Sequence, residues 1–380
     1  MKEPFNPDNR YGDDKVTEAC GLFGVMDTTG GVFSGDYVIK GMTNMHVRSN
    51  GLGGGFAVYG LYPQHQDCYA LHIMYMEHAA QHETEELLKL AFRIVHSEAI
   101  PIRETRGIVN PPAVWRYFVQ PVPAKEGHHS DDDYTMAQVM RINLTIKDAF
   151  VFSSGKNMGA FKGVGYPEDI ANYFRLDDYR GYLWTGHGRF PTNTPGWWGG
   201  AHPFSILDWT VVHNGELSSY GINRRHLEMY GYHCTMQTDT EVDAYAVDLL
   251  IRRHGLSVET TAKVLAPPLW EHIDRMPEAE RDLHRTLRQV YGSLLLNGPF
   301  TIIIAHNGEM IGLTDRIRLR PLTAATKGTL LFLSSEESAI RLVCPDLDAA
   351  WIPMGGEPII GSLHRPLPAP AREAQKLGVV

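Results

Sequence analysis

The stretch Cys20-Gly-Leu-Phe-Gly-Val-Met26 decides how the rest of the chain is interpreted. It is a short apolar run of the kind that forms a buried strand. Residues 1–19 are polar and contain two prolines, so they predict a leader, or propeptide, outside the fold. A lone cysteine beside an apolar run is most often a small buried hydrophobic side chain. If the leader is removed, however, Cys20 carries a thiol and a free α-amine on one residue.

A cysteine at the first position of a mature chain has the chemistry of a nucleophile with its own base. An α-amine titrates at about 7.7–8.0, close to a thiol at about 8.5 and far below a lysine amine. The amine can therefore take the thiol proton near neutral pH, and one residue supplies both nucleophile and general base. Residues 1–19 show no clear protease site, so we expect this cleavage to be autocatalytic.

Two motifs in the middle of the chain offer groups that could bind a substrate. Residues 186–194 form a glycine-containing turn around Arg189. An arginine in such a turn is most often structural, but its guanidinium can also hold a carboxylate through two hydrogen bonds. His213-Asn214-Gly215-Glu216 ends a predicted strand over 209–216. Asn-Gly predicts a tight hairpin turn, or else the Asn214 amide and the Gly215 N–H supply two donors for an oxyanion.

A third motif, Thr238-Asp-Thr-Glu241, has the form of a capping box with Thr238 as N-cap and Glu241 three residues later. Asp239 then lies at the start of a helix. A carboxylate is favoured there by the helix dipole alone, or it serves as the counter-ion of a ligand ammonium group.

The letters HNGE occur a second time, at His306-Asn-Gly-Glu309, between two apolar runs. That spacing predicts a β-hairpin. No arginine turn precedes this copy and no Asp-Thr-Glu follows it, so we assign it to structure. The repetition shows that HNGE alone is weak evidence for a site.

Composition narrows the class of protein. The chain has 380 residues, 43% of them hydrophobic, and a net charge of −9, with no basic run that would suit nucleic acid. No apolar stretch is long enough to cross a membrane, and residues 1–19 lack the apolar region of a signal peptide. The four cysteines lie far apart, which argues against a metal or iron–sulfur site in this chain and favours a reducing cytoplasm.

Periodicity along the chain predicts an α+β fold with mostly antiparallel strands. Helical spacing marks 36–48, 83–95 and, interrupted by prolines, 257–291, whereas 69–76, 147–154 and 300–305 are strand-like. Residues 101–135, rich in Pro, His and Asp, predict a loop or edge excursion. We therefore expect one domain over 20–345 with insertions at about 78–146 and 255–292, and a weakly ordered tail over 346–380.

Taken together and in this order, the motifs resemble the class II glutamine amidotransferases, which are N-terminal-nucleophile hydrolases. The elements are Cys-Gly-Leu-Phe-Gly (20–24), Arg48 before a glycine-rich turn, Gly-His-x-Arg-Phe-Pro-Thr (186–192), His-Asn-Gly-Glu (213–216) and Thr-Asp-Thr-Glu (238–241). Further pieces resemble the amidotransferase part of glutamate synthase: 189–194, a following tryptophan, Pro203-Phe204 and Asp315-Arg316 before 319–322. His202 departs from that pattern, because relatives often have glutamine there.

The resemblance implies a four-layer αββα sandwich and a role for each matching residue. Cys20 would attack the glutamine amide and form a thioester. Asn214 and Gly215 would form the oxyanion hole. The substrate α-carboxylate would meet Arg189 and its α-ammonium Asp239. Thr192 would line the site, and Arg48 would support the nucleophile loop from beneath.

The resemblance also implies that two different chains carry out the two parts of the overall reaction. Glutamine would be hydrolysed here and the ammonia passed to a separate synthase subunit of the glutamate synthase type, which would carry FMN and an iron–sulfur cluster. This chain would hold no cofactor and no metal. Two alternatives remain: a subunit of N-methylglutamate synthase, or a non-catalytic glutamine-binding regulatory module if the leader is retained.

Overall fold

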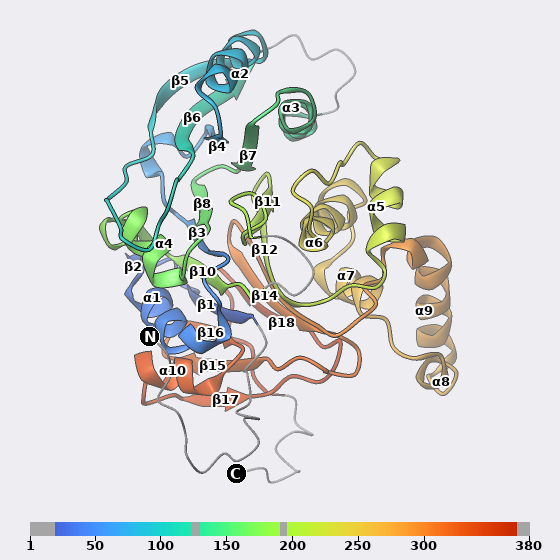
Figure 1. Cartoon of the computed structure of the whole chain (residues 1–380). Helices are drawn as coiled ribbons and strands as arrows, with labels where there is room; N and C mark the ends of the chain where they lie inside the picture. The colour runs from blue at the N-terminus through green and yellow to red at the C-terminus, as the bar shows by residue number, and fades with distance from the viewer. Residues whose placement is uncertain (1–19, 123–129, 191–195, 371–380) are drawn as a thin grey trace, which may run out of the picture.

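The computed structural model describes residues 20–122, 130–190 and 196–370. In this part of the chain, two antiparallel sheets lie face to face and helices cover the outer side of each sheet (Figure 1). The arrangement confirms the expected α+β fold and its αββα layers. Successive side chains of a strand point to opposite faces of its sheet. Apolar side chains on the inner faces pack between the two sheets, and those on the outer faces pack under the helices, so the core has more than one layer.

The first sheet has seven strands in the order β17-β15-β16-β1-β10-β3-β8. Helices α1, α4 and α10 cover its outer face (Figure 1). Two further strands pair with each other beside this sheet. The bounds are β1 (Gly21–Asp27), β2 (Phe33–Ser34), α1 (Asp36–Asn44), β3 (Gly54–Tyr59), β8 (Met158–Gly163), α4 (Pro167–Tyr173), β9 (Arg180–Gly181), β10 (Leu183–Gly188), β15 (Thr323–Lys327), β16 (Leu330–Ser334), α10 (Glu337–Val343) and β17 (Ala349–Trp351).

The second sheet has five strands in the order β11-β12-β13-β14-β18, with α5 and α6 on its outer side and α7 to α9 beyond them. Three separate helices thus occupy the segment 257–291 that the prolines interrupt. The bounds are β11 (Phe204–Ile206), β12 (Trp209–Gly215), α5 (Tyr220–Glu228), α6 (Thr240–Val247), the π-helical turn η4 (Asp248–Arg253), α7 (Val258–Leu265), α8 (Trp270–Ile273), α9 (Glu278–Tyr291), β13 (Phe300–His306), β14 (Glu309–Thr314) and β18 (Ile359–Ser362).

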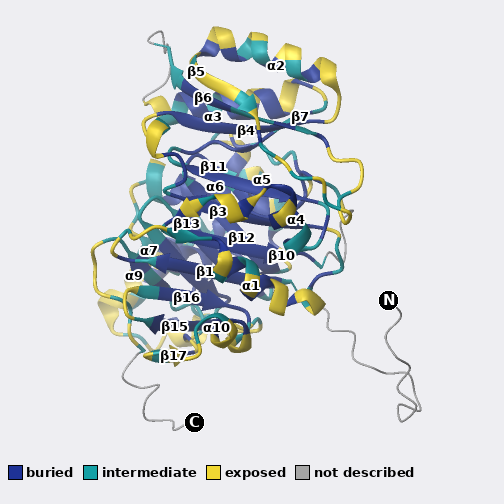
Figure 2. Cartoon of the chain, turned by 90° about the vertical axis from the view of Figure 1, so that its left-hand side faces the viewer, coloured by how far each residue is buried: buried dark blue, intermediate teal, exposed yellow. Residues whose placement is uncertain are grey.

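Strand β1 shows why the opening stretch is buried on both sides. Leu22 and Met26 pack into the layer between the sheets, whereas Phe23 and Val25 pack under the helices. Gly24 faces the second sheet at a crowded point, because a Cβ there would lie 2.8 Å from Met310 Sδ. Figure 2 shows β1, β10 and β12 as buried strands in the middle of the molecule.

The segment expected to be an insertion, 78–146, lies within a four-stranded sheet and its two helices, which begin at Tyr69 and end at Ser153. This unit runs β4 (Tyr69–Tyr75), α2 (His78–Ala91), β5 (Phe92–Ala99), β6 (Ala113–Pro121), α3 (Asp131–Thr145) and β7 (Ala149–Ser153), in the sheet order β5-β6-β4-β7. This βαββαβ sequence of elements is the ferredoxin-like motif. The expected loop over 101–135 is therefore wrong in part, since β6 and the start of α3 lie within it. The helix expected over 83–95 ends at Ala91, where β5 begins.

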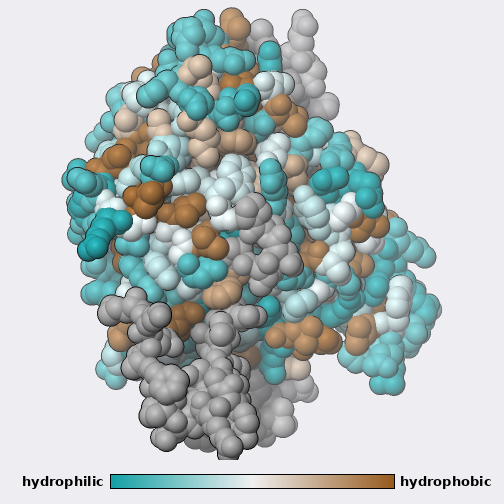
Figure 3. Space-filling model, viewed as in Figure 1, coloured by the Kyte–Doolittle hydropathy of each residue, from teal (hydrophilic) through white to brown (hydrophobic). Residues whose placement is uncertain are grey.

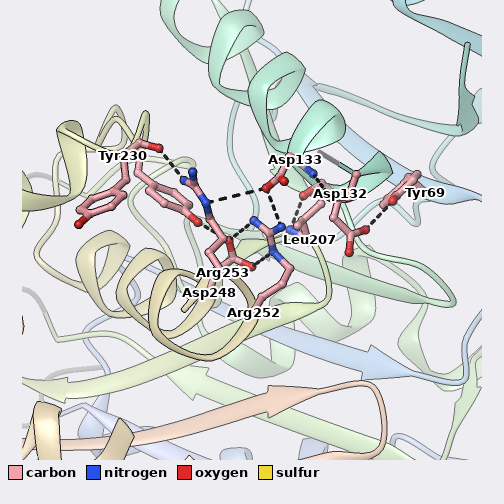
Figure 4. A network of polar contacts seen from close by, with 11 residues as sticks. Tyr69, Asp132, Asp133, Leu207, Tyr230, Asp248, Arg252 and Arg253 are labelled. Carbon is pink, nitrogen blue, oxygen red and sulfur yellow. Dashed lines mark hydrogen bonds and ion pairs between the residues drawn. The ribbon is translucent and has the colours of Figure 1, made fainter. Parts of the chain in front are cut away.

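A network of charged side chains joins the inserted unit to the core (Figure 4). Arg252 donates to Asp133 of α3 at 2.8 Å and to both oxygens of Asp248 at 2.6 and 2.8 Å. Tyr232 also donates to the buried Asp248 carboxylate. The N-terminal turn of α3 is thereby fixed to the end of the α6–η4 helix.

The segment 346–380, which the sequence predicts to be a weakly ordered tail, contributes an edge strand to each sheet. Trp351 of β17 pairs with Ala324, and Ile359 of β18 pairs with Gly312. The predicted domain end at 345 is therefore too early. These strands have only three and four residues, too few for a periodic signal. Among the described residues, none of the helices is both long enough and apolar enough to span a bilayer. On the face seen in Figure 3, apolar side chains are scattered among hydrophilic ones.

Candidate active site

The pairing of β1 with β10 brings the predicted nucleophile next to the predicted carboxylate-binding arginine. Gly21 lies opposite Gly188, so Cys20 precedes one strand exactly where Arg189 follows the other. The backbone N–H of Phe190 donates to Cys20 Sγ at 3.3 Å. Residues separated by about half the chain are thus placed side by side by the register of one strand pair.

The surroundings of Cys20 shift the pKa of its thiol in opposite directions. Burial raises the pKa of the thiol, whereas the Phe190 N–H and the guanidinium groups of Arg189 and Arg320 lower it. The thiol therefore needs a base to become a nucleophile, and positive charge nearby stabilises the thiolate once it forms. Arg320 lies in the Leu-Arg-Pro-Leu segment used for the family resemblance, but the sequence indicates no site role for it.

Asn214 and Gly215 end β12 in the second sheet, facing β13. They do not form the hairpin turn that the Asn-Gly pair also allows, because the chain continues past Gly215 with Glu216 N donating to Pro299 O. Gly215 has a φ of +154°, and a Cβ there would lie 2.0 Å from Pro299 O. The Asn214 side-chain amide is buried, and its nitrogen has no hydrogen-bond partner in the described part of the chain. A free donor at this point is what an oxyanion hole requires.

Asp239 immediately precedes α6 and is partly exposed. Its Oδ2 accepts a hydrogen bond from Leu217 N at 2.9 Å, which ties the helix start to the segment after the oxyanion strand. The predicted capping box is only partly right. Thr238 Oγ1 does accept from Thr240 N, but the Glu241 carboxylate binds the N–H groups of Thr235 and Met236. Glu241 is buried, and so it fixes the loop before the helix.

These groups surround one cavity of about 220 Å³. The cavity is thus far larger than the space that a single water molecule needs. A cationic guanidinium, a carboxylate, a thiol and a backbone N–H face it together. The lining residues are Cys20, Arg189, Phe190, His202, His213, Gly215, Glu216, Leu217, Tyr220, Gln237, Thr238, Asp239 and Thr240.

Three predicted site residues are not among those that line the cavity. Asn214 directly precedes Gly215, but its own side-chain amide nitrogen is buried. Arg48 is outside the cavity wall; it donates to Cys20 O at 3.4 Å and pairs with Glu336 at 2.7 Å, so it contacts the backbone that carries the nucleophile. Thr192 falls in 191–195, outside the described residues. No motif in the sequence marks Glu336 as a partner of Arg48. Glu336 is the N-cap residue of α10 and lies almost 300 residues after Arg48 in the chain.

Three buried histidines, which the sequence predicts to be scattered, gather at one wall of the cavity, and two of them, His202 and His213, line it. His202 Nε2 and His213 Nδ1 both bond to Thr240 Oγ1, at 2.8 and 3.0 Å. The His187 ring packs against His202 in a tilted arrangement with centroids 3.9 Å apart, and His187 Nε2 donates to His213 O. Burial lowers the pKa of all three rings, for His187 to about 3, so they are neutral near pH 7. Among the described residues, no group of three or more metal-ligating side chains is assembled.

Comparison with known proteins identifies the family of this chain. The family model for class II glutamine amidotransferases matches residues 57–346, a range that begins after Cys20 and Arg48. An uncharacterized protein of Archaeoglobus fulgidus is 60% identical over 92% of this chain and 94% of its own. A Methanothermobacter thermautotrophicus protein with the provisional name glutamine amidotransferase is 25% identical over 88% of this chain and 97% of its own.

Larger enzymes match over part of their length. The amidophosphoribosyltransferase of Methanocaldococcus jannaschii is 27% identical over 53% of this chain, which is 36% of that protein. Among solved structures, the Bacillus subtilis glutamine phosphoribosylpyrophosphate amidotransferase is 17% identical, with a TM-score of 0.46, over 90% of this chain and 47% of that one. Since the family model covers most of the chain, the protein belongs to the class II glutamine amidotransferases.

Proposed function

We propose that this chain hydrolyses glutamine to glutamate and ammonia at Cys20 and passes the ammonia to a separate synthase subunit of the glutamate synthase type. The observation that carries the proposal is the single cavity in which the Cys20 thiol, the Arg189 guanidinium and the Asp239 carboxylate meet. A free α-amino acid has one carboxylate and one ammonium group, and this pair of charges complements both.

In the proposed reaction, the Cys20 thiolate attacks the side-chain amide carbon of glutamine. The oxyanion that develops is stabilised by the Asn214 side-chain amide and the Gly215 N–H. The α-amine of Cys20, freed by loss of residues 1–19, takes the thiol proton and gives it to the departing nitrogen, which leaves as ammonia. Water then cleaves the glutamyl thioester and restores the thiol.

The proposal places the use of ammonia on another chain. The Archaeoglobus fulgidus relative matches over 92% of this chain and 94% of its own length. The hydrolysis needs no cofactor, and we assign FMN and an iron–sulfur cluster to the synthase subunit. The four cysteines are all free thiols, in keeping with a reducing cytoplasm.

The first test is whether the chain begins at Cys20 and whether that residue reacts. Intact mass should show loss of residues 1–19, and the purified protein, alone or with its synthase subunit, should release ammonia from glutamine. Cys20→Ala should abolish this activity and keep the melting temperature, whereas Cys68→Ala, another buried cysteine, should leave turnover unchanged. A full-length chain without glutaminase activity, even with the partner, would instead support a glutamine-binding regulatory module.

The second test distinguishes the acceptors. The complex isolated with the native partner should be flavin-yellow and should form glutamate from glutamine and 2-oxoglutarate with a reductant. Formation of N-methylglutamate from methylamine in its place would assign the chain to N-methylglutamate synthase. A partner that contains no flavin would refute both synthase assignments.

A further inference from the structure

The nucleophile, the oxyanion donors and the ammonium-binding carboxylate come from three different layers of the fold. Cys20 precedes β1 of the first sheet, Asn214 and Gly215 end β12 of the second sheet, and Asp239 is the N-cap residue of α6. Each layer has its own packing, so their relative position at the site depends on contacts that cross between them.

The buried histidines supply such cross-links. His187 belongs to β10 and lies opposite Leu22 of β1, so it moves with the strand that carries Cys20. Its Nε2–H donates at 3.0 Å to the carbonyl of His213, the residue directly before Asn214. One imidazole therefore links the nucleophile's sheet to the oxyanion strand.

Thr240 links the helix to the same point. Its hydroxyl, 1% exposed, lies 2.8 Å from His202 Nε2 and 3.0 Å from His213 Nδ1, and it is the next residue after Asp239. A hydroxyl has one proton, which Thr240 can donate to one of these imidazoles or to Asp239 Oδ1 at 3.4 Å, and its oxygen accepts from an imidazole N–H. Both rings are neutral, and each can therefore present one donor and one acceptor nitrogen.

The His213 ring in turn packs against the oxyanion strand end. A Cβ on Gly215 would lie 2.9 Å from His213 Nε2, which shows how closely the ring approaches that residue's Cα. His213 is 2% exposed, and its Nε2 has no hydrogen-bond partner among the described residues. The orientation of the ring is thus set through Nδ1, the atom that bonds to Thr240.

We propose that the Thr240 hydroxyl, bridging His202 and His213, is a positioning device that holds the oxyanion donors Asn214 and Gly215 in line with Cys20. This inference rests on the proposed glutamine hydrolysis at Cys20. Thr240, His202 and His213 are positioning residues, because they act through the backbone of β12 and through the start of α6. The simplest alternative is that the bridge only stabilises the fold.

The test uses the protein as purified and a reaction that needs no partner subunit. The diazo-ketone analogue of glutamine alkylates a thiol in a glutamine site, and mass spectrometry follows the modified chain. Thr240→Val keeps the shape of the side chain and removes the hydroxyl. At saturating analogue, alkylation should slow by about tenfold to a hundredfold, the cost of a small misplacement of reacting groups. The half-saturating concentration should change by less than about threefold.

Matched variants separate positioning from stability. Thr240→Ser keeps the hydroxyl and should react within about threefold of the unmodified protein. His202→Gln, whose amide can still reach Thr240, should react faster than His202→Leu. Thr84→Val removes an equally buried threonine hydroxyl, bonded to Ala80 O in the inserted unit, and should leave the rate unchanged.

Each outcome decides one question. A normal rate for Thr240→Val, a slow rate for Thr240→Ser, or a change confined to the half-saturating concentration would overturn the positioning role. If Thr240→Val does not fold, equal rates for His202→Gln and His202→Leu would overturn it. If the unmodified protein is not alkylated at Cys20, the proposed function itself fails, and the two failures are thereby distinguished.

Discussion

At the residue scale, the candidate site combines a cationic guanidinium, that of Arg189, with an anionic carboxylate, that of Asp239. Arg189 is almost fully buried, and burial lowers the pKa of its guanidinium, whereas the charges of Cys20, Asp239 and Glu216 raise it. The Arg189 guanidinium lines the cavity together with Cys20 and Asp239. Its proposed role is to bind the carboxylate of the substrate through two hydrogen bonds.

Arg189→Lys should chiefly raise the KM for glutamine, by about tenfold or more, because a planar fork with two hydrogen bonds becomes a point charge. The kcat should change far less, since the reacting amide lies at the other end of glutamine. Steady-state kinetics of ammonia release measure both. Arg103→Lys, an exposed arginine paired with Asp177, is the control. An unchanged KM would show that Arg189 is structural.

At the element scale, the two HNGE copies show how context decides the meaning of a motif. In the first copy, Gly215 ends a strand against the carbonyl of Pro299. In the second, Gly308 sits in a true hairpin between β13 and β14 with a φ of +89°, and a Cβ there would meet only Leu363 at 3.7 Å.

Alanine at the two glycines should therefore have different effects. Gly308→Ala should cost about 1–2 kcal/mol of unfolding free energy, the penalty of a left-handed conformation, and leave glutaminase activity intact. Gly215→Ala should abolish activity and destabilise more, because its Cβ cannot be accommodated beside Pro299 O. Urea unfolding and glutaminase assays test the pair. Equal activity of both variants would contradict the assigned roles.

The buried lysine of β8 predicts a pH dependence of stability. Lys162 is 1% exposed, donates to Gly199 O at 3.0 Å, and has its pKa lowered to about 7 by burial. Between about 7 and the unfolded pKa of about 10.4, the unfolded chain binds a proton that the folded chain lacks. This group's contribution to stability is therefore present at high pH and is lost as pH falls through about 10 toward 7. Burial raises the pKa of Glu241 to about 7, so this carboxyl group affects the pH dependence of stability only below about pH 7.

Lys162→Met should remove this slope, which is at most about 1.4 kcal/mol per pH unit. Urea unfolding at several pH values between about 7 and about 10 would measure it. Lys147→Met, at a side chain that is 93% exposed, should keep the slope of the unmodified protein. A slope that persists in Lys162→Met would mean that another group causes it.

At the scale of the whole molecule, the inserted ferredoxin-like unit is fixed to the core by a partly buried ion network. Asp248 is fully buried, and Arg252 is its cationic partner and the link to Asp133 (Figure 4). Removing one partner of a buried pair leaves an uncompensated charge, which costs more than an exposed pair contributes.

Arg252→Ala should lower the unfolding free energy by about 3 kcal/mol. Hydrogen exchange should increase in α3 and η4 together, since both lose the same anchor. Arg175→Ala, which breaks an exposed pair with Asp178, should cost less than about 1 kcal/mol. If exchange in α3 does not change, the network does not hold the inserted unit in place.

The fold and site could be anticipated from sequence wherever a local pattern carries the information. The strands β1, β12 and β13 follow from apolar runs, and the β13–β14 hairpin follows from its Asn-Gly turn. The sequence does not predict strand β6, because the residues around it in the chain are polar and rich in proline. In the structure it pairs with a strand on each side. The sequence does not predict the edge strands β17 and β18, because they have no periodic pattern of apolar residues. They are strands because each pairs with a neighbouring strand.

The sequence by itself indicated the family through the order of its motifs, and the resemblance to that family implied the αββα layers and the residues proposed for the site. Only the tertiary structure decided which groups meet. The β1–β10 register places Arg189 beside Cys20, and Glu336 reaches Arg48 across the chain. Three separate histidine positions converge on one threonine and one carbonyl. The physical reason is that such contacts depend on strand register and helix docking, which are set by the packing of the whole core rather than by neighbours in the sequence.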